Sequence, residues 1–176
     1  MHPSAFSPDG FIIDQRHTKA AKYGARSSDH NGCGWIAAYN FLRAVGEEDD
    51  WQQIVNDMRR GSPFLCALGT GPFRLKRYLK RRGYTLTLAR GRHAAIKLAE
   101  ASGAGILFYQ HSRGLHFVAF TREPDGQFRF FNAVLGDAKH VMGMGEFLDK
   151  HAKRWPVWVL GQNRTEIHDR AERAKK

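Results

Sequence analysis

The feature that most constrains this chain is one stretch, residues 29–40, in which a short polar loop passes into an apolar run with a cysteine at the junction. Gly32 and Gly34 flank Cys33, and the apolar residues that follow recur at helical spacing. The pattern predicts a helix over about 34–45 with Cys33 at or beside its first turn. Free backbone N–H groups and the positive end of the helix dipole favour a thiolate there. Cys33 is therefore a candidate nucleophile whose pKa we expect to be lowered beside a cationic group.

Length and composition predict one globular domain over residues 1–161, followed by a charged tail at 162–176. The 176 residues are 42% apolar, which suffices for a hydrophobic core without disulfide staples. No apolar stretch approaches the roughly 18 residues of a membrane span. The N-terminus also lacks the basic and apolar regions of a signal peptide. We expect a cytoplasmic protein without membrane insertion, and export by another route stays open.

The order of predicted elements indicates an α+β fold in which helices precede a mainly antiparallel sheet. Residues 1–28 read as irregular apart from a short strand at 11–13. Pro124-Asp125-Gly126 predicts a hairpin turn between two of the strands. The expected helices are 34–45, 51–58, 72–82, 92–101 and 144–152, and the expected strands are 84–88, 105–109, 115–121, 127–132 and 157–160.

A cysteine nucleophile needs a base and a group that orients the base. His116 differs from most of the nine histidines, because it begins a strongly apolar strand directly after a polar loop. The predicted hairpin returns the chain so that residues near 132–134 lie beside residue 116. Asn132 stands there, and its side-chain amide oxygen could accept the imidazole N–H and fix the ring. Spacing alone thus predicts a Cys33–His116–Asn132 triad.

The sequence gives less support to a functional role for the second cysteine, Cys66, or to a metal site. Cys66 lies in an apolar run and is expected in the core, and two cysteines do not make a disulfide scaffold. His111, His116 and Cys33 lack the ligand spacing of a zinc site. We therefore expect no metal and no cofactor.

The ordered residues Cys33-Gly34, His116-Phe117-Val118 and Asn132-Ala133 resemble the papain-like cysteine peptidases. They are most similar to the bacterial branch of double-glycine leader peptidases that process bacteriocins. The resemblance covers roughly residues 23–160. It implies a papain-like fold, with N-terminal helices that carry the cysteine packed on a sheet that carries the histidine and asparagine.

The resemblance also implies a mechanism. His116 would hold Cys33 as a thiolate, and the sulfur would attack a peptide or amide carbonyl to give a thioester on the way to hydrolysis. Two positions depart from the family pattern. The glutamine expected five or six residues before the cysteine is replaced by Ser27 and Ser28, which leaves Asn31 or a serine as the oxyanion donor. Asn132-Ala133 stands where that branch often has Asp-Pro.

Two alternatives stay open. The same triad supports deamidation or amide transfer, which act on peptide or protein substrates without cutting them. The net charge of +11 and a basic predicted helix at 72–82 favour weak non-specific binding to acidic partners or nucleic acid. The rival class is therefore a catalytically inactive, basic nucleic-acid-binding or protein-binding module.

Overall fold

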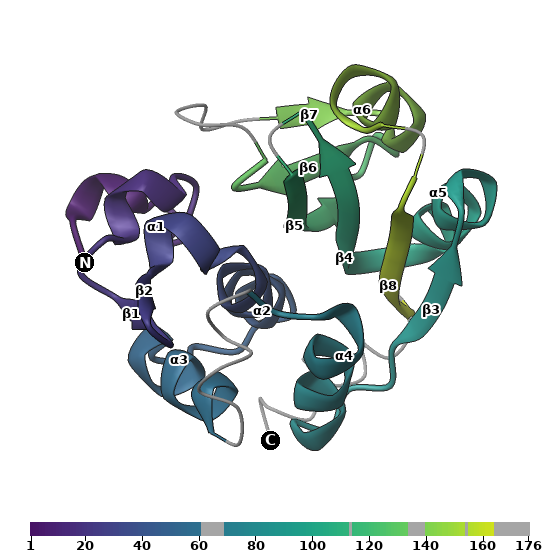
Figure 1. The fold of residues 1–176 in the computed structure, drawn as a ribbon. Coiled ribbons are helices and arrows are strands. Elements are labelled where there is room, and N and C mark those ends of the chain that lie inside the picture. The colour runs from purple at the N-terminus through teal and green to yellow at the C-terminus, as the bar shows by residue number, and fades with distance from the viewer. Residues whose placement is uncertain (61–68, 113, 134–139, 154, 164–176) are drawn as a thin grey trace.

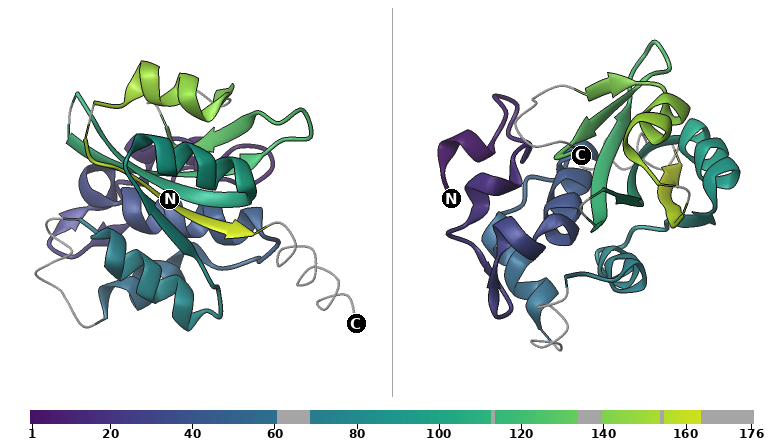
Figure 2. Two further views of the ribbon diagram at one scale, coloured as in Figure 1. Left: turned by 90° about the vertical axis from the view of Figure 1, so that its right-hand side faces the viewer. Right: turned by 45° about the horizontal axis from the view of Figure 1, so that its top comes forward.

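The computed structural model describes residues 1–60, 69–112, 114–133, 140–153 and 155–163. Its centre is a six-stranded sheet in the order β3-β8-β4-β5-β6-β7, with every neighbouring pair antiparallel. Helix α2 covers one face of this sheet, and α5 and α6 cover the other (Figure 1; Figure 2). The bounds are α1 Ser28–Asn31, α2 Cys33–Ala44, α3 Trp51–Arg59, α4 Pro72–Arg81, α5 Arg92–Ala101, α6 Met144–His151, β1 Lys22–Tyr23, β2 Arg26–Ser27, β3 Thr87–Arg90, β4 Ser102–His111, β5 Gly114–Arg122, β6 Phe128–Phe131, β7 His140–Met142 and β8 Val157–Asn163. The predicted α+β class with a mainly antiparallel sheet is confirmed.

The two faces of the sheet form two hydrophobic clusters because successive strand side chains point to opposite faces. Ile106 and Phe108 of β4 pack in the cluster that contains α2, whereas Leu107 and Tyr109 pack in the cluster that contains α5 and α6. The neighbouring strand β5 divides in the same way, with Phe117 in the first cluster and Val118 in the second. The two central strands, β4 and β5, are therefore packed on both faces, which fixes the positions of the residues at their ends.

Helix α2 is buried along nearly its whole length, as its apolar pattern predicts. Its glycine neighbours serve packing within the chain. A Cβ on Gly34 would collide with the side chain of Thr70, and a Cβ on Gly32 would collide with Ser28 and with the indole of Trp35. The close packing around Cys33, at the junction of α1 and α2, therefore requires glycine on both sides of it.

Most predicted elements lie within a few residues of the observed ones, but the N-terminal part differs. The expected strand at 11–13 is a single bridge between Phe6 and Ile12. Residues 1–28 are not irregular: they form two 3-10 helices, Pro3–Ala5 and Gln15–Thr18, and the β1–β2 hairpin. The strand expected at 84–88 begins only at Thr87, and the short edge strand β7 carries no clear sequence signal.

The end of the domain also extends beyond its predicted limit. Strand β8 continues to Asn163, so the first two residues of the expected tail belong to the sheet. The rest of that tail lies outside the described residues, as does Cys66. Among the described residues, no helix combines the length and apolar character needed to cross a bilayer.

Candidate active site

Cys33, His116 and Asn132 line a single cavity of about 770 Å³ at one end of the central strands. The N-terminus of α2 carries the cysteine, β5 carries the histidine, and the asparagine follows the last residue of β6. The β5–β6 ladder ends at Ala119 and Phe131, so the two strands part before reaching His116. The predicted hairpin and the predicted convergence of the three residues are both present. The other residues that line the cavity are Gln15, Asp29, His30, Tyr109, His111, Ser112, Leu115, Ala133, Lys150 and His151.

Burial and backbone hydrogen bonds have opposite effects on the pKa of the Cys33 thiol. Burial raises the pKa of Cys33, and backbone hydrogen bonding from Phe117, Gly34 and Cys33 itself partly offsets that rise. The expected lowering of the thiol pKa is therefore wrong. A helix dipole contributes only about 0.3–1 kcal/mol to a thiolate, whereas desolvation can shift a buried group by up to about 3–5 pKa units. Cys33 is half-buried, and desolvation is the largest of these effects, so the pKa of the thiol is shifted upward and the neutral thiol is favoured.

The His116 imidazole is also held in its neutral form. Burial is the main cause that lowers its pKa to about 4, the hydrogen bond to Asn132 raises it, and the charge of His111 lowers it further. Its Nε2 lies 2.7 Å from the backbone carbonyl oxygen of Asn132. Because a carbonyl oxygen only accepts, Nε2 must carry the proton. In the neutral ring the remaining nitrogen, Nδ1, is then the base.

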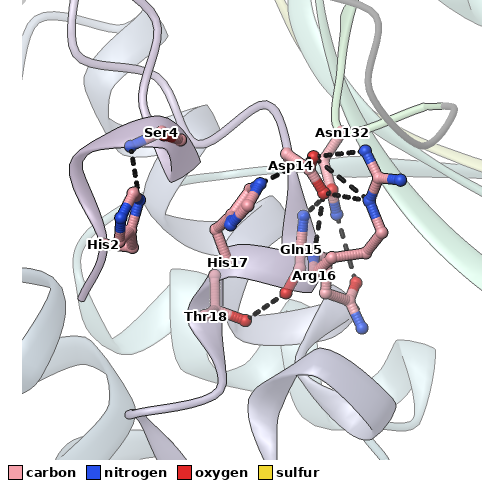
Figure 3. A network of polar contacts seen from close by, with 8 residues as sticks. All are labelled: His2, Ser4, Asp14, Gln15, Arg16, His17, Thr18 and Asn132. Carbon is pink, nitrogen blue, oxygen red and sulfur yellow. Dashed lines mark hydrogen bonds and ion pairs between the residues drawn. The ribbon is translucent and has the colours of Figure 1, made fainter.

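The prediction that the Asn132 side chain orients His116 is wrong. The backbone carbonyl of Asn132 makes that hydrogen bond instead. The side chain instead faces Gln15: its Oδ1 accepts from the Gln15 backbone N–H at 3.0 Å, and its Nδ2 donates to the Gln15 Oε1 at 3.2 Å (Figure 3). Asn132 has φ of 61°, the left-handed conformation that asparagine tolerates better than most residues. That turn directs the carbonyl at His116 and the amide at Gln15.

Gln15 is the residue that sequence reasoning missed. It is buried, lines the cavity, and is fixed at both ends of its amide. Oε1 accepts from Asn132, which leaves Nε2 as the donor group, and Nε2 donates one hydrogen to the backbone carbonyl of Asp29 at 3.1 Å. An amide nitrogen carries two hydrogens, so the second is available to a ligand. The one sequence signal for Gln15 was indirect: Ser27 and Ser28 stand where the family pattern has a glutamine, so the oxyanion donor had to come from elsewhere in the chain.

Asn31 is placed differently from the other candidates. Its side-chain Nδ2 donates to the backbone carbonyl of Tyr23 at 2.8 Å, and Asn31 is not among the residues that line the cavity. The structure therefore does not bring it to Cys33 as an oxyanion donor. Its bond to Tyr23 ties α1 to the β1–β2 hairpin.

No residue of α4 lines the cavity, so the basic surface on this helix lies outside the candidate site. Leu75, Tyr78 and Leu79 are buried, whereas Arg77, Lys80 and Arg81 are exposed and Arg74 donates to the backbone carbonyl of Met58. The last residue of the predicted helix, Arg82, is committed to ion pairs with Glu47 and Asp49. Within the described ranges, no group of three or more histidine, cysteine or acidic side chains is arranged to hold a metal ion.

Comparison with protein-family models and with curated proteins gave no match. The geometry of the cavity is therefore the basis for any functional conclusion.

Proposed function

We propose that this protein is a papain-like cysteine hydrolase that cleaves peptide or amide bonds through an acyl-enzyme on Cys33. The observation that carries the proposal is the meeting, in one cavity, of a thiol at a helix N-terminus and an imidazole whose Nε2–H is fixed by a carbonyl. That hydrogen bond leaves Nδ1 as the base, which is the arrangement nucleophilic catalysis needs. The position of α1 to α4 in the chain, ahead of the six strands of the main sheet, supports a papain-like arrangement.

The reaction starts from neutral groups. The Cys33 sulfur forms a bond to the carbonyl carbon while His116 Nδ1 takes the thiol proton, and the carbonyl electron pair moves to the oxygen. Collapse of this intermediate breaks the carbon–nitrogen bond, and the leaving amine takes the proton from His116. Water then attacks the thioester with His116 again as base, which releases the acid and restores the thiol.

The oxyanion requires donors that are in place before the reaction. Gln15 is our choice for the side-chain donor, because Asn132 and Asp29 hold its amide in one orientation and Gln15 lines the same cavity as Cys33. The N-terminus of α2, which has no side-chain cap, supplies the positive end of the helix dipole. Gln15 thus takes the role that the family pattern assigns to a glutamine much nearer the cysteine.

Mass spectrometry of a mixed peptide library tests the function and separates its alternatives. Hydrolysis predicts pairs of fragments that share one added water, and a Cys33→Ala sample should show none of them. Intact peptides whose glutamine has become glutamate would indicate a deamidase, and intact peptides joined to an added amine would indicate a transferase. A library unchanged by the wild-type protein, or changed equally by Cys33→Ala, would contradict the proposal.

A further inference from the structure

One part of the cavity is lined by basic side chains that the proposed reaction does not use. His111 ends β4, and Lys150 and His151 end α6, so two elements contribute to it. The groups lie close enough to affect one another. Burial lowers the pKa of His151, and the charges of His140, Lys150 and His111 lower it further.

The acidic residues nearby do not offset this basic group. Asp149 precedes Lys150 on α6, but its carboxylate lies 2.6 Å from Arg92. Asp29 is the one acidic residue among the described cavity residues, and it belongs to α1, with its carboxylate 3.7 Å from His30. Figure 1 shows α1 and α6 on different sides of the sheet. Lys150 has no carboxylate partner in the described part of the chain.

His151 adds an independent observation. Its Nε2 is shielded from solvent and makes no hydrogen bond to any described residue. Buried polar atoms in native proteins are nearly always paired, so an exception calls for a partner such as an ion or a ligand. The chemistry that satisfies an imidazole beside an ammonium group is an anion.

We propose that His111, Lys150 and His151 form a subsite for a carboxylate of the substrate, either an acidic side chain or a chain terminus. The inference rests on the proposed function only in treating that ligand as a substrate. The subsite adjoins the reacting groups, since the rings of His111 and His116 are 5.6 Å apart in an edge-to-face arrangement. A carboxylate bound there would offset the charge of His111 and so favour the protonated His116 that the leaving amine needs.

Histidine ring NMR with small probes tests this subsite without requiring turnover. N-acetylglutamate N-methylamide carries a side-chain carboxylate, N-acetylglutamine carries a terminal one, and N-acetylglutamine N-methylamide carries neither. We expect saturable shifts of the His111 and His151 signals, and an increase in the pKa of His151, with one or both of the acidic probes only. The probe that binds more tightly identifies the source of the carboxylate.

Charge reversal supplies the matched variants. Lys150→Glu should weaken binding of the acidic probe roughly fivefold or more. Lys97→Glu makes the same charge change on the exposed surface of α5, outside the cavity, and should leave binding within about twofold. Equal binding of the neutral probe, or equal effects of the two variants, would overturn the subsite. Probe binding without peptide hydrolysis would overturn the proposed function alone, and hydrolysis without carboxylate binding would overturn the subsite alone.

Discussion

Alanine in place of His116 is expected to lower the rate of Cys33 acylation at pH 7 by about 10²–10⁴-fold, the usual contribution of a positioned general base. Cys33→Ala should abolish acylation entirely. The reason is that burial keeps the thiol protonated, so without a base at His116 the sulfur is a weak nucleophile. The burst of nitrophenol from a p-nitrophenyl ester, followed by intact mass and peptide mapping, measures the rate and the site.

The matched control for this prediction is His93→Ala, because His93 is exposed on α5 and does not line the cavity. It should acylate at the wild-type rate. Thermal unfolding of each variant establishes that the fold is retained. Acylation of Cys33 at an unchanged rate in a folded His116→Ala protein would remove His116 from the mechanism.

Gln15→Ala is expected to lower kcat by about 10²–10³-fold with little change in KM, because an oxyanion donor acts in the transition state and contributes roughly 2.7–4 kcal/mol. Gln15→Glu should lose a comparable amount, since a carboxylate has no N–H to donate. The second variant is nearly isosteric and guards against a packing defect, because Gln15 is buried. Steady-state kinetics on a peptide found by the library experiment provides the measurement.

Gln52→Ala is the control for Gln15, as Gln52 is an exposed glutamine on α3. It should match the wild type in both constants. A Gln15→Ala protein with normal kcat, or one whose loss lies only in KM, would assign Gln15 to substrate binding or to structure and leave the oxyanion without a side-chain donor.

The parts of the fold and site that could be predicted from sequence are those with strong local patterns. The helix after Cys33 and the strand after His116 are fixed by apolar periodicity, and the turn at Asp125-Gly126 sets the hairpin. Together they bring Cys33, His116 and Asn132 to one cavity.

The details that could not be predicted depend on tertiary contacts. Gln15 reaches the cavity because Asn132 hydrogen-bonds to both its backbone and its side chain, over a separation along the chain that no local motif records. The backbone carbonyl of Asn132, rather than its side chain, contacts His116 because Asn132 adopts a positive φ, which local sequence does not reveal. The thiol pKa depends on burial, which a helix-start motif does not reveal.

The most direct test of the central claim, that Cys33 and His116 react as a neutral thiol and a neutral base, is the pH dependence of Cys33 acylation in the wild type and in His116→Ala. His116 is a base only when unprotonated, and its lowered pKa keeps it unprotonated above about pH 4. The part of the rate that depends on His116 should therefore rise with a midpoint near pH 4 and stay level through neutral pH. In His116→Ala, only the increase due to thiolate at alkaline pH should remain. A midpoint near 6.5, the ordinary value for histidine, or identical profiles for the two proteins, would contradict the account.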